Sequence, residues 1–271
     1  MRAWCNGSLV EPTDPAVSLL DHGFTVGDGV FEAIKVVDNQ PFALTRHLRR
    51  LTRSATGLGL PEPDHDQVRR GIEATIEGQH LAYGRIRVTY TAGISPLGSN
   101  RNITDPTVAV VTAKATPFEP STKGVVVPWP RNERAATAGL KTTSYADNVV
   151  ALAYAAERSA SEAIFANTAG NLCEGTGSNV FCVFDGTVVT PPLSAGCLAG
   201  ITRELLIEWY DVHERDISMA EFAEADEVFF TSTTRDIQAI HDIDGRPLDI
   251  HKVTERVIEE WRAREVQDLD P

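Results

Sequence analysis

The sequence is poor in cysteine, and the few cysteines it has form no motif. None belongs to a Cys-x-x-Cys pair or stands at metal-ligand spacing from the scattered histidines, which argues against a structural zinc site. A disulfide-stapled scaffold is excluded, because 271 residues are enough to bury a core without cross-links. We expect no metal and four reduced thiols, namely Cys5, Cys173, Cys182 and Cys197.

Positive charge is also scarce. The chain has 25 Lys and Arg residues against 38 Asp and Glu residues, so its formal net charge is −13 at pH 7. Such a chain repels a phosphate backbone, and nucleic acid is not an expected partner. No apolar run approaches the roughly 20 residues that span a bilayer, and the N-terminal residues turn polar at once, unlike a secretory signal. The sequence therefore predicts a soluble, cytoplasmic protein without membrane contact.

Motifs of several large enzyme classes are missing. Neither Gly27-Asp28-Gly29 nor the pair Gly175 and Gly177 completes a Gly-x-Gly-x-x-Gly fingerprint before a helix, so a Rossmann dinucleotide site is not supported. The sequence also lacks a P-loop and a Gly-x-Ser-x-Gly nucleophile elbow. These absences argue against P-loop nucleotide hydrolysis and against an α/β-hydrolase.

The pattern of hydrophobic residues indicates two domains of a mixed α/β (α+β) fold. At roughly 150 residues per domain, 271 residues suggest about two domains. Hydrophobic periodicity predicts strands at 31–37, 41–44, 85–91, 107–113, 125–127, 163–167, 178–184, 187–190 and 227–231, and helices at 45–58, 64–78, from 147 onward, 201–210 and 253–266. Proline and hydroxyl residues make 116–124 the best linker candidate. We therefore expect a small N-terminal domain (1–115), a linker (116–124) and a larger C-terminal domain (125–271).

Three polar segments could carry chemistry, although each has a purely structural alternative. Lys141 stands alone among small polar residues before a helix, and a lone lysine usually solvates a surface. Glu174 ends an apolar stretch, where a carboxylate could equally cap a turn. Gly200 precedes a predicted helix whose first amides, with the Thr202 hydroxyl, could hold an anion, but most such starts are only caps. A lysine, a carboxylate and a phosphate site together are the parts that a pyridoxal-phosphate enzyme requires.

An ordered set of motifs along nearly the whole chain resembles the class IV, or fold-type IV, pyridoxal-phosphate aminotransferases. This family includes D-amino-acid and branched-chain aminotransferases, (R)-amine transaminases and 4-amino-4-deoxychorismate lyase. The motifs are the Gly-Asp-Gly-Val-Phe-Glu run at 27–32, the helical segment 42–55, Lys141 with Asn148 and Val149, the segment 174–181, the Leu-Ala-Gly-Ile-Thr-Arg run at 198–203, and the segment 230–234. The chain is most similar to D-amino-acid aminotransferases and lyase-like members.

The resemblance assigns roles to individual residues. Lys141 would form the Schiff base with pyridoxal 5′-phosphate and then move the proton between substrate and cofactor. Glu174 would keep the ring nitrogen protonated. Tyr145 would either hydrogen-bond the phenolic oxygen or simply pack. The other implied cofactor ligands are Arg50, the Ile201 amide, Thr202 and Thr233 for the phosphate, Leu198 for the ring face, and Ser178 and Asn179 of the Glu174 motif.

The same resemblance implies the fold, the assembly and the reaction. It implies a small N-terminal α/β sandwich, a larger barrel-like C-terminal α/β domain and a cofactor at the domain boundary. It also implies a homodimer in which the partner's small domain helps to close the substrate pocket. The reaction would be a ping-pong exchange in which a small-molecule amino donor leaves as a keto acid and a keto-acid acceptor takes the amino group.

The residues around Phe31 favour a transaminase for D-amino acids. The lyase typically has a threonine just after this position, whereas this chain has Glu32 and Ala33. Lys35 matches the Val-Lys ending of D-amino-acid aminotransferases. We expect D-alanine or D-glutamate to react with pyruvate or 2-oxoglutarate, with (R)-primary amines as a secondary possibility. The lyase, by pyruvate elimination, and a branched-chain L-amino-acid aminotransferase stay open as alternatives.

The pattern offers several candidates for the partner of the substrate carboxylate. D-amino-acid aminotransferases use an arginine and a histidine after a Gly-Thr-Ser-Pro turn, and here that turn is the segment 93–96, Gly-Ile-Ser-Pro, followed by no such pair. A buried carboxylate still needs a cationic partner. Arg101 is the first candidate, followed by Arg85, Arg87 and Arg235. The other residues expected at the substrate are Phe31, Ala33, Lys35 and Thr234.

Overall fold

The computed structural model describes residues 1–102, 105–248 and 252–271, which divide into two compact units. The first unit consists of Met1–Pro117, Leu140–Ser144 and Asp270, and the second of Phe118–Gly139, Tyr145–Leu269 and Pro271. The chain thus changes unit between Pro117 and Phe118, inside the expected boundary region. The short segment with Lys141, expected in the C-terminal domain, is part of the first unit instead.

The first unit is a two-layer α/β sandwich built on an antiparallel sheet. Its strands are β1 (Arg2–Cys5), β2 (Ser8–Val10), β3 (Gly29–Val37), β4 (Gln40–Pro41), β5 (Tyr83–Thr91) and β6 (Thr107–Lys114), in the order β2-β1-β6-β5-β3-β4. Its helices are α1 (His22–Val26), α2 (Leu44–Gly57) and α3 (His65–Ile76). The predicted strand at 41–44 is confirmed only at its first residue: β4 pairs with β3 through Gln40–Pro41, Ala43 then turns the backbone into the left-handed region, and α2 begins at Leu44.

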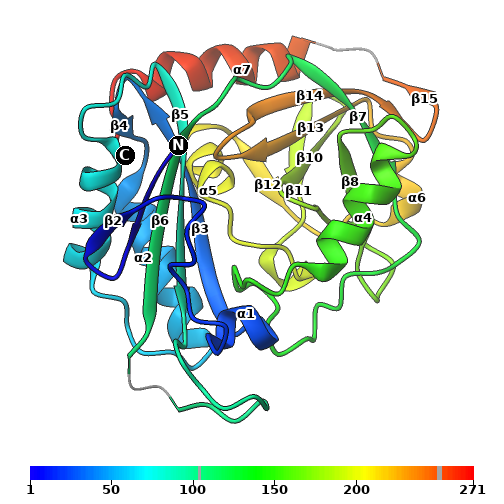
Figure 1. Cartoon of the computed structure of the whole chain (residues 1–271). Coiled ribbons are helices and arrows are strands. Elements are labelled where there is room, and N and C mark those ends of the chain that lie inside the picture. The colour runs from blue at the N-terminus through cyan, green and yellow to red at the C-terminus, as the bar shows by residue number, and fades with distance from the viewer. Residues whose placement is uncertain (103–104, 249–251) are drawn as a thin grey trace. The chain divides into compact units, whose positions relative to one another are not determined.

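The core of the first unit lies between one face of the sheet and helices α2 and α3 (Figure 1). Alternation along β3 places Val30, Ile34 and Val36 on this face, against the Leu48 and Leu51 stripe of α2. The opposite face of β3 therefore carries the odd-numbered residues from Phe31 to Lys35. This second face carries an aromatic ring and a lysine, Phe31 and Lys35, which are 6% and 1% exposed.

The second unit is a mixed sheet with helices on both faces. The strands are β7 (Ser121–Val126), β8 (Glu162–Ala166), β9 (Leu172–Gly175), β10 (Asn179–Phe184), β11 (Thr187–Thr190), β12 (Val212–Glu214), β13 (Glu227–Ser232), β14 (Asp236–Ile243) and β15 (Arg246–Pro247). Their order is β12-β11-β10-β13-β14-β7-β8-β9, with β15 on β14. Because β9, at one end of this order, also contacts β10, the sheet curls like part of a barrel (Figure 1).

Four helices and one 3₁₀ turn complete the described part of the second unit. They are α4 (Ala146–Ala156), η1 (Leu193–Ala195), α5 (Ile201–Trp209), α6 (Met219–Phe222) and α7 (Lys252–Glu265). Helix α4 packs on a cluster with Val125 and Phe165, whereas α6 covers a separate cluster around Phe230. The predicted linker is partly wrong, because its last residues lie in β7, which pairs in parallel with β8 and β14. No helix in the described residues is long and apolar enough to cross a membrane.

Candidate active site

In the first unit, Lys141 is fixed against β3 and α2. Its carbonyl accepts a hydrogen bond from the Phe31 amide (3.0 Å), and its own amide donates to Ser54 Oγ (3.2 Å). Thr143 continues this pairing by donating its amide to the Gly29 carbonyl at 2.8 Å. The Lys141 ammonium nitrogen lies 4.4 Å from the centre of the Phe31 ring. The predicted catalytic lysine therefore has a defined place beside the first predicted motif.

Three charged or titratable side chains form a buried cluster between β3 and α2. Glu32 accepts hydrogen bonds from Arg50 at both oxygens (Nε to Oε1, 2.9 Å; Nη2 to Oε2, 2.6 Å) and from His47 Nδ1 (2.7 Å). Burial raises the pKa of Glu32, but the Arg50 charge and the hydrogen bonds of Arg50 and His47 outweigh it and lower this pKa to about 2. Burial lowers the pKa of His47, so its neutral ring donates from Nδ1. The two hydrogen bonds fix the orientation of the Arg50 guanidinium, and the Glu32 carboxylate balances its charge.

The opposite face of β3 brings Phe31, Ala33 and Lys35 together with an arginine of the neighbouring strand. Antiparallel pairing sets Ala33 opposite Arg87, which places both side chains on the same face. The Arg87 guanidinium carbon lies 3.9 Å from the centre of the Phe31 ring, and its Nε donates to Thr89 Oγ1 at 3.2 Å. Arg87 and the Lys141 ammonium therefore contact the same aromatic ring.

Arg101, the first candidate for the substrate carboxylate, is paired within the first unit. Its Nε and Nη2 donate to the two oxygens of Asp28 at 2.7 and 2.6 Å. Asp28 also accepts from His22 Nδ1 (2.7 Å), and His22 Nε2 faces the Gly98 carbonyl (2.8 Å). Both ring nitrogens thus face hydrogen-bond acceptors, and the hydrogen bonds of Gly98 and Asp28 raise the pKa of His22. Arg101 thus serves to hold its own loop onto the start of β3.

In the second unit, Glu174 at the end of β9 is tied to the 198–203 motif. Its Oε2 accepts the Leu198 amide at 2.8 Å, and the Leu198 carbonyl accepts from Asn179 Nδ2 at 2.8 Å. Arg131 lies on the other side of the carboxylate, with Nε 3.2 Å from Oε1. Three predicted residues therefore meet, and Arg131, which belongs to no recognised motif, joins them.

The start of α5 is shaped for close approach by an anion. Its N-cap is Gly200, which offers no side-chain acceptor to the first amides, and Ile201 and Thr202 follow as buried residues. A Cβ at Gly200 would collide with the amide oxygen of Asn179, so a larger residue there would have to displace that side chain. Unsatisfied first-turn amides and the helix dipole favour negative charge at such a terminus. The phosphate role of Ile201 and Thr202 stays a prediction.

Arg235 has a structural partner in the second unit. Its guanidinium lies 3.2 Å from Glu162, a carboxylate that is only 2% exposed. Glu162 also accepts the Thr176 amide (2.8 Å) and the Gly177 amide (3.2 Å). Burial raises the pKa of Glu162, against the opposing effect of the Arg235 charge. Arg235 therefore connects the loop of Thr233 and Thr234 to the turn that follows Glu174.

The structure also places two further predicted cofactor ligands. Ser178 is buried in the turn between β9 and β10, and Tyr145 precedes α4 as its N-cap without a side-chain cap. Sequence reasoning assigned no role to His47, Arg131 or Glu162. His47 had a signal, since it lies one helical turn before Arg50 on the buried face of α2. Arg131 and Glu162 had none.

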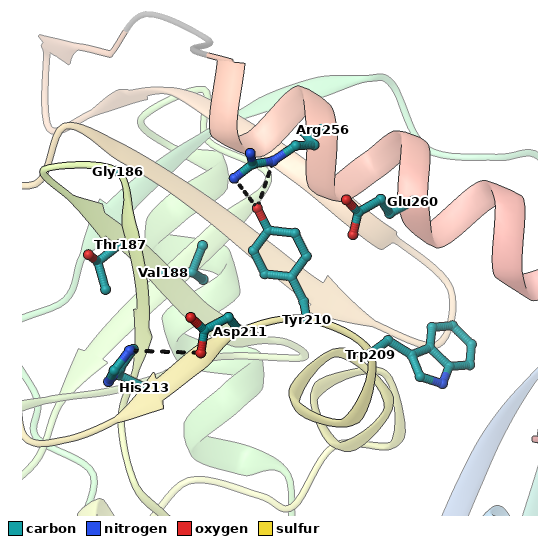
Figure 2. Close-up of a pocket in the computed structure, with 9 residues that line it drawn as sticks. All are labelled: Gly186, Thr187, Val188, Trp209, Tyr210, Asp211, His213, Arg256 and Glu260. Carbon is teal, nitrogen blue, oxygen red and sulfur yellow. Dashed lines mark hydrogen bonds and ion pairs between the residues drawn. The ribbon is translucent and has the colours of Figure 1, made fainter.

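A cavity of about 340 Å³ lies elsewhere in the second unit (Figure 2). Figure 2 shows Arg256 of α7 donating to the Tyr210 hydroxyl at its upper edge, and the ion pair between His213 and Asp211 below. None of the nine lining residues is a predicted site residue. Within the described residues, no group of three or more His, Cys, Asp and Glu side chains is arranged to hold a metal ion. The predicted site residues instead lie in other parts of the chain, among them Lys141 in the first unit and Glu174 in the second.

The model of one protein family, "Amino-transferase class IV", matches residues 29–243, which include both of these segments. The chain belongs to this family. The "Bifunctional aminodeoxychorismate lyase / D-amino acid transaminase" of Mycobacterium tuberculosis is 29% identical over 97% of this chain and 98% of its own length. A D-alanine aminotransferase of Staphylococcus aureus is also 29% identical, over 93% of this chain and 92% of its own.

Solved structures of aminotransferases share the whole fold. A branched-chain aminotransferase from Thermoproteus uzoniensis, solved with norvaline, superposes with a TM-score of 0.89 at 29% identity, covering 97% of this chain and 93% of its own. A PLP-bound aminotransferase from Mycobacterium tuberculosis superposes with a TM-score of 0.87 at 26% identity, covering 99% and 100% of the two chains. The expected fold-type IV architecture is thus confirmed.

Class IV aminotransferases use pyridoxal 5′-phosphate, and the residues of this aminotransferase fit that cofactor. The first unit supplies a primary amine at Lys141 and a rigidly held guanidinium at Arg50. The second unit supplies the Glu174 carboxylate and the uncapped first turn of α5. An amine for the aldehyde, a carboxylate for the ring nitrogen, and cationic and amide donors for the phosphate are the groups that pyridoxal phosphate needs.

Proposed function

We propose that this class IV aminotransferase moves the amino group of a D-amino acid to a 2-keto acid. The observation that carries the proposal is the shared contact of Arg87 and Lys141 with the Phe31 ring, at 3.9 and 4.4 Å. A guanidinium that contacts the same ring as the reactive amine suits a donor that carries an α-carboxylate. The D-configuration is supported by the two relatives whose names include D-amino acid or D-alanine transamination.

We propose the following roles for the predicted cofactor ligands. Arg50 would bind the phosphate and Lys141 would hold the cofactor covalently, then carry the proton at the substrate Cα. When bound, the cofactor supplies an electron sink for the carbanion. Glu174 would keep the ring nitrogen protonated, and Leu198 would support the ring. The amide of Ile201 and the hydroxyls of Thr202 and Thr233 would complete the phosphate site, and Ser178, Asn179 and Tyr145 would line it.

The position after Phe31 favours transamination over pyruvate elimination. Glu32 points into the buried cluster with Arg50 and His47, so it does not supply a polar group to the substrate face. Ala33, which does share that face, has no hydroxyl. The polar residue that the lyase typically carries here therefore has no counterpart. On the substrate face, we propose Phe31, Ala33, Lys35 and Thr234 as contacts and Arg87 as the carboxylate partner.

The test is a comparison of amino donors. D-alanine, L-valine and an (R)-primary amine are each supplied with 2-oxoglutarate, and glutamate formation is measured. The proposal expects D-alanine to be preferred. Preference for L-valine would establish the branched-chain alternative, and pyruvate release from aminodeoxychorismate without amino transfer would establish the lyase.

Replacing Arg87 by alanine is expected to raise the KM for D-alanine about 10- to 100-fold, because a charge-assisted contact to the carboxylate is lost. Activity with a primary amine, which has no carboxylate, should stay unchanged. The matched control is Arg70→Ala, at an exposed arginine of α3. An unchanged KM in Arg87→Ala would reject Arg87 as the carboxylate partner.

We also propose a homodimer. An exposed apolar surface of the first unit supports the dimer. It includes residues of the α1 region and of the 93–97 loop, which are joined by an antiparallel β-bridge between the backbones of Asp21 and Ile94. The exposed side chains, 42–78% accessible, are Val17, Leu19, Leu20, Phe24, Val26, Ile94 and Leu97. A patch of this kind marks an interface more often than bare surface. Light scattering should give the mass of two chains for the native protein and of one chain for Phe24→Asp. A single-chain mass for both would reject the dimer.

A further inference from the structure

An arginine of the second unit lies against the carboxylate that is proposed to face the cofactor ring. Arg131 Nε is 3.2 Å from Glu174 Oε1, while the Leu198 amide donates to Oε2 at 2.8 Å. The two side chains are 20% and 14% exposed, so water screens their attraction only partly. Glu174 therefore has a positive charge on one oxygen and a backbone donor on the other.

Three contacts hold the arginine in this place. The Arg131 amide donates to the Ala166 carbonyl at 2.7 Å, which pins the backbone to the end of β8. The guanidinium lies over the Phe165 ring, 4.2 Å from its centre. Its Nη1 donates to Asn148 Oδ1 at 3.0 Å, and Asn148 in turn donates to the Thr176 carbonyl. The arginine is oriented by a strand, a ring and an amide at once, which is more support than a surface ion pair receives.

We propose that Arg131 is a positioning residue that sets the basicity of Glu174. The inference rests on the proposed role of Glu174 as partner of the ring nitrogen. A cation beside a carboxylate stabilises its ionised form and lowers its affinity for a proton. The proton shared between Glu174 and the ring nitrogen would therefore stay on the nitrogen. Without the Arg131 charge, the N–H bond would break and an O–H bond would form at Glu174, leaving a neutral ring that withdraws electrons less well.

The test compares Arg131→Met, which removes the charge, with Arg131→Lys, which keeps it. The holoenzyme is loaded with pyridoxal phosphate carrying ¹⁵N in the ring, and the nitrogen chemical shift is recorded by NMR across a pH series. In Arg131→Met the shift should move toward that of the unprotonated ring at neutral pH, and the rate of the D-alanine half-reaction should fall about tenfold or more. Arg131→Lys should keep the native shift.

Controls separate this role from a structural one. Arg158→Met removes another arginine of the second unit, which lies over Tyr154 and is half-exposed, and it should change neither readout. If Arg131→Met does not fold, Asn148→Ala, which removes one support of the guanidinium, should move the nitrogen shift in the same direction by a smaller amount. A native shift in a folded Arg131→Met, or equal losses in the Met and Lys variants, would overturn the proposal.

Failure of the underlying function gives a different result. If Glu174 does not face the ring nitrogen, Glu174→Gln will leave the nitrogen shift unchanged. In that case the role of Glu174 falls, and with it the role of Arg131. If Glu174→Gln moves the shift but Arg131→Met does not, only the inference about Arg131 is wrong.

Discussion

Replacing Lys141 by alanine is expected to abolish transamination. The variant loses the amine that is proposed to hold the cofactor and to move the Cα proton, and the loss of general acid–base catalysis alone costs about 10²- to 10⁴-fold in rate. Borohydride reduction of the native holoenzyme should fix the cofactor on the peptide that contains Lys141, as mass spectrometry can show. In the variant, no peptide should be labelled.

The matched control for this prediction is Lys114→Ala. Lys114 is an exposed lysine at the end of β6, in the same unit as Lys141. It should keep native activity and native labelling. Partial rescue of Lys141→Ala by added methylamine would support a proton-transfer role. Labelling of a different lysine in the native enzyme would contradict the assignment of Lys141.

Replacing Glu32 by glutamine is expected to destabilise the fold strongly. The change removes the carboxylate that pairs with Arg50 and leaves a buried guanidinium without its counter-charge, which typically costs about 3–5 kcal/mol. That is a large part of the roughly 5–15 kcal/mol by which domains are stable. Urea unfolding at pH 7, without added cofactor, measures the difference. The control Glu73→Gln, on the exposed face of α3, should change the unfolding free energy by less than about 0.5 kcal/mol.

The effect of Glu32→Gln should also depend on pH. The native pKa of Glu32 is lowered to about 2 from the usual 4.5, so its stabilisation is complete above about pH 4.5 and is lost as the pH falls toward 2. The shift corresponds to about 3 kcal/mol. The gap between native and variant unfolding free energies should therefore narrow between pH 5 and pH 3. A gap that is constant over this range would show that Glu32 does not fold as a buried anion.

Local patterns predicted much of the fold. The alternation along β3 and the apolar stripe of α2 follow from side-chain period alone, and both elements form where expected. Two expectations failed because backbone pairing with segments distant in sequence outweighed the local amino-acid composition on which they were based. The end of the proline-rich linker is recruited into β7 by β8 and β14. The Lys141 segment joins the first unit because its backbone pairs with β3, more than 100 residues earlier.

The candidate site was predictable in its motifs but not in its counter-ions. Sequence shows that Arg101 and Arg235 carry charge, but not that Asp28 and Glu162 neutralise them across the fold. The same holds for Arg131 beside Glu174, where 43 residues separate the partners. Ion pairs of this kind form between segments that are distant in sequence, so the hydrophobic periodicity of a single helix or strand does not predict them. Because Arg101 is paired with Asp28, we propose Arg87 as the carboxylate partner in its place.

The most direct test of the account is a single-turnover absorbance trace. The holoenzyme is mixed with D-alanine in the absence of a keto-acid acceptor, and released pyruvate is quantified. The account predicts that the band of the lysine-bound cofactor converts to that of the pyridoxamine form, with one pyruvate per site, and that L-alanine reacts far more slowly. An unchanged band with D-alanine would contradict D-amino-acid transamination.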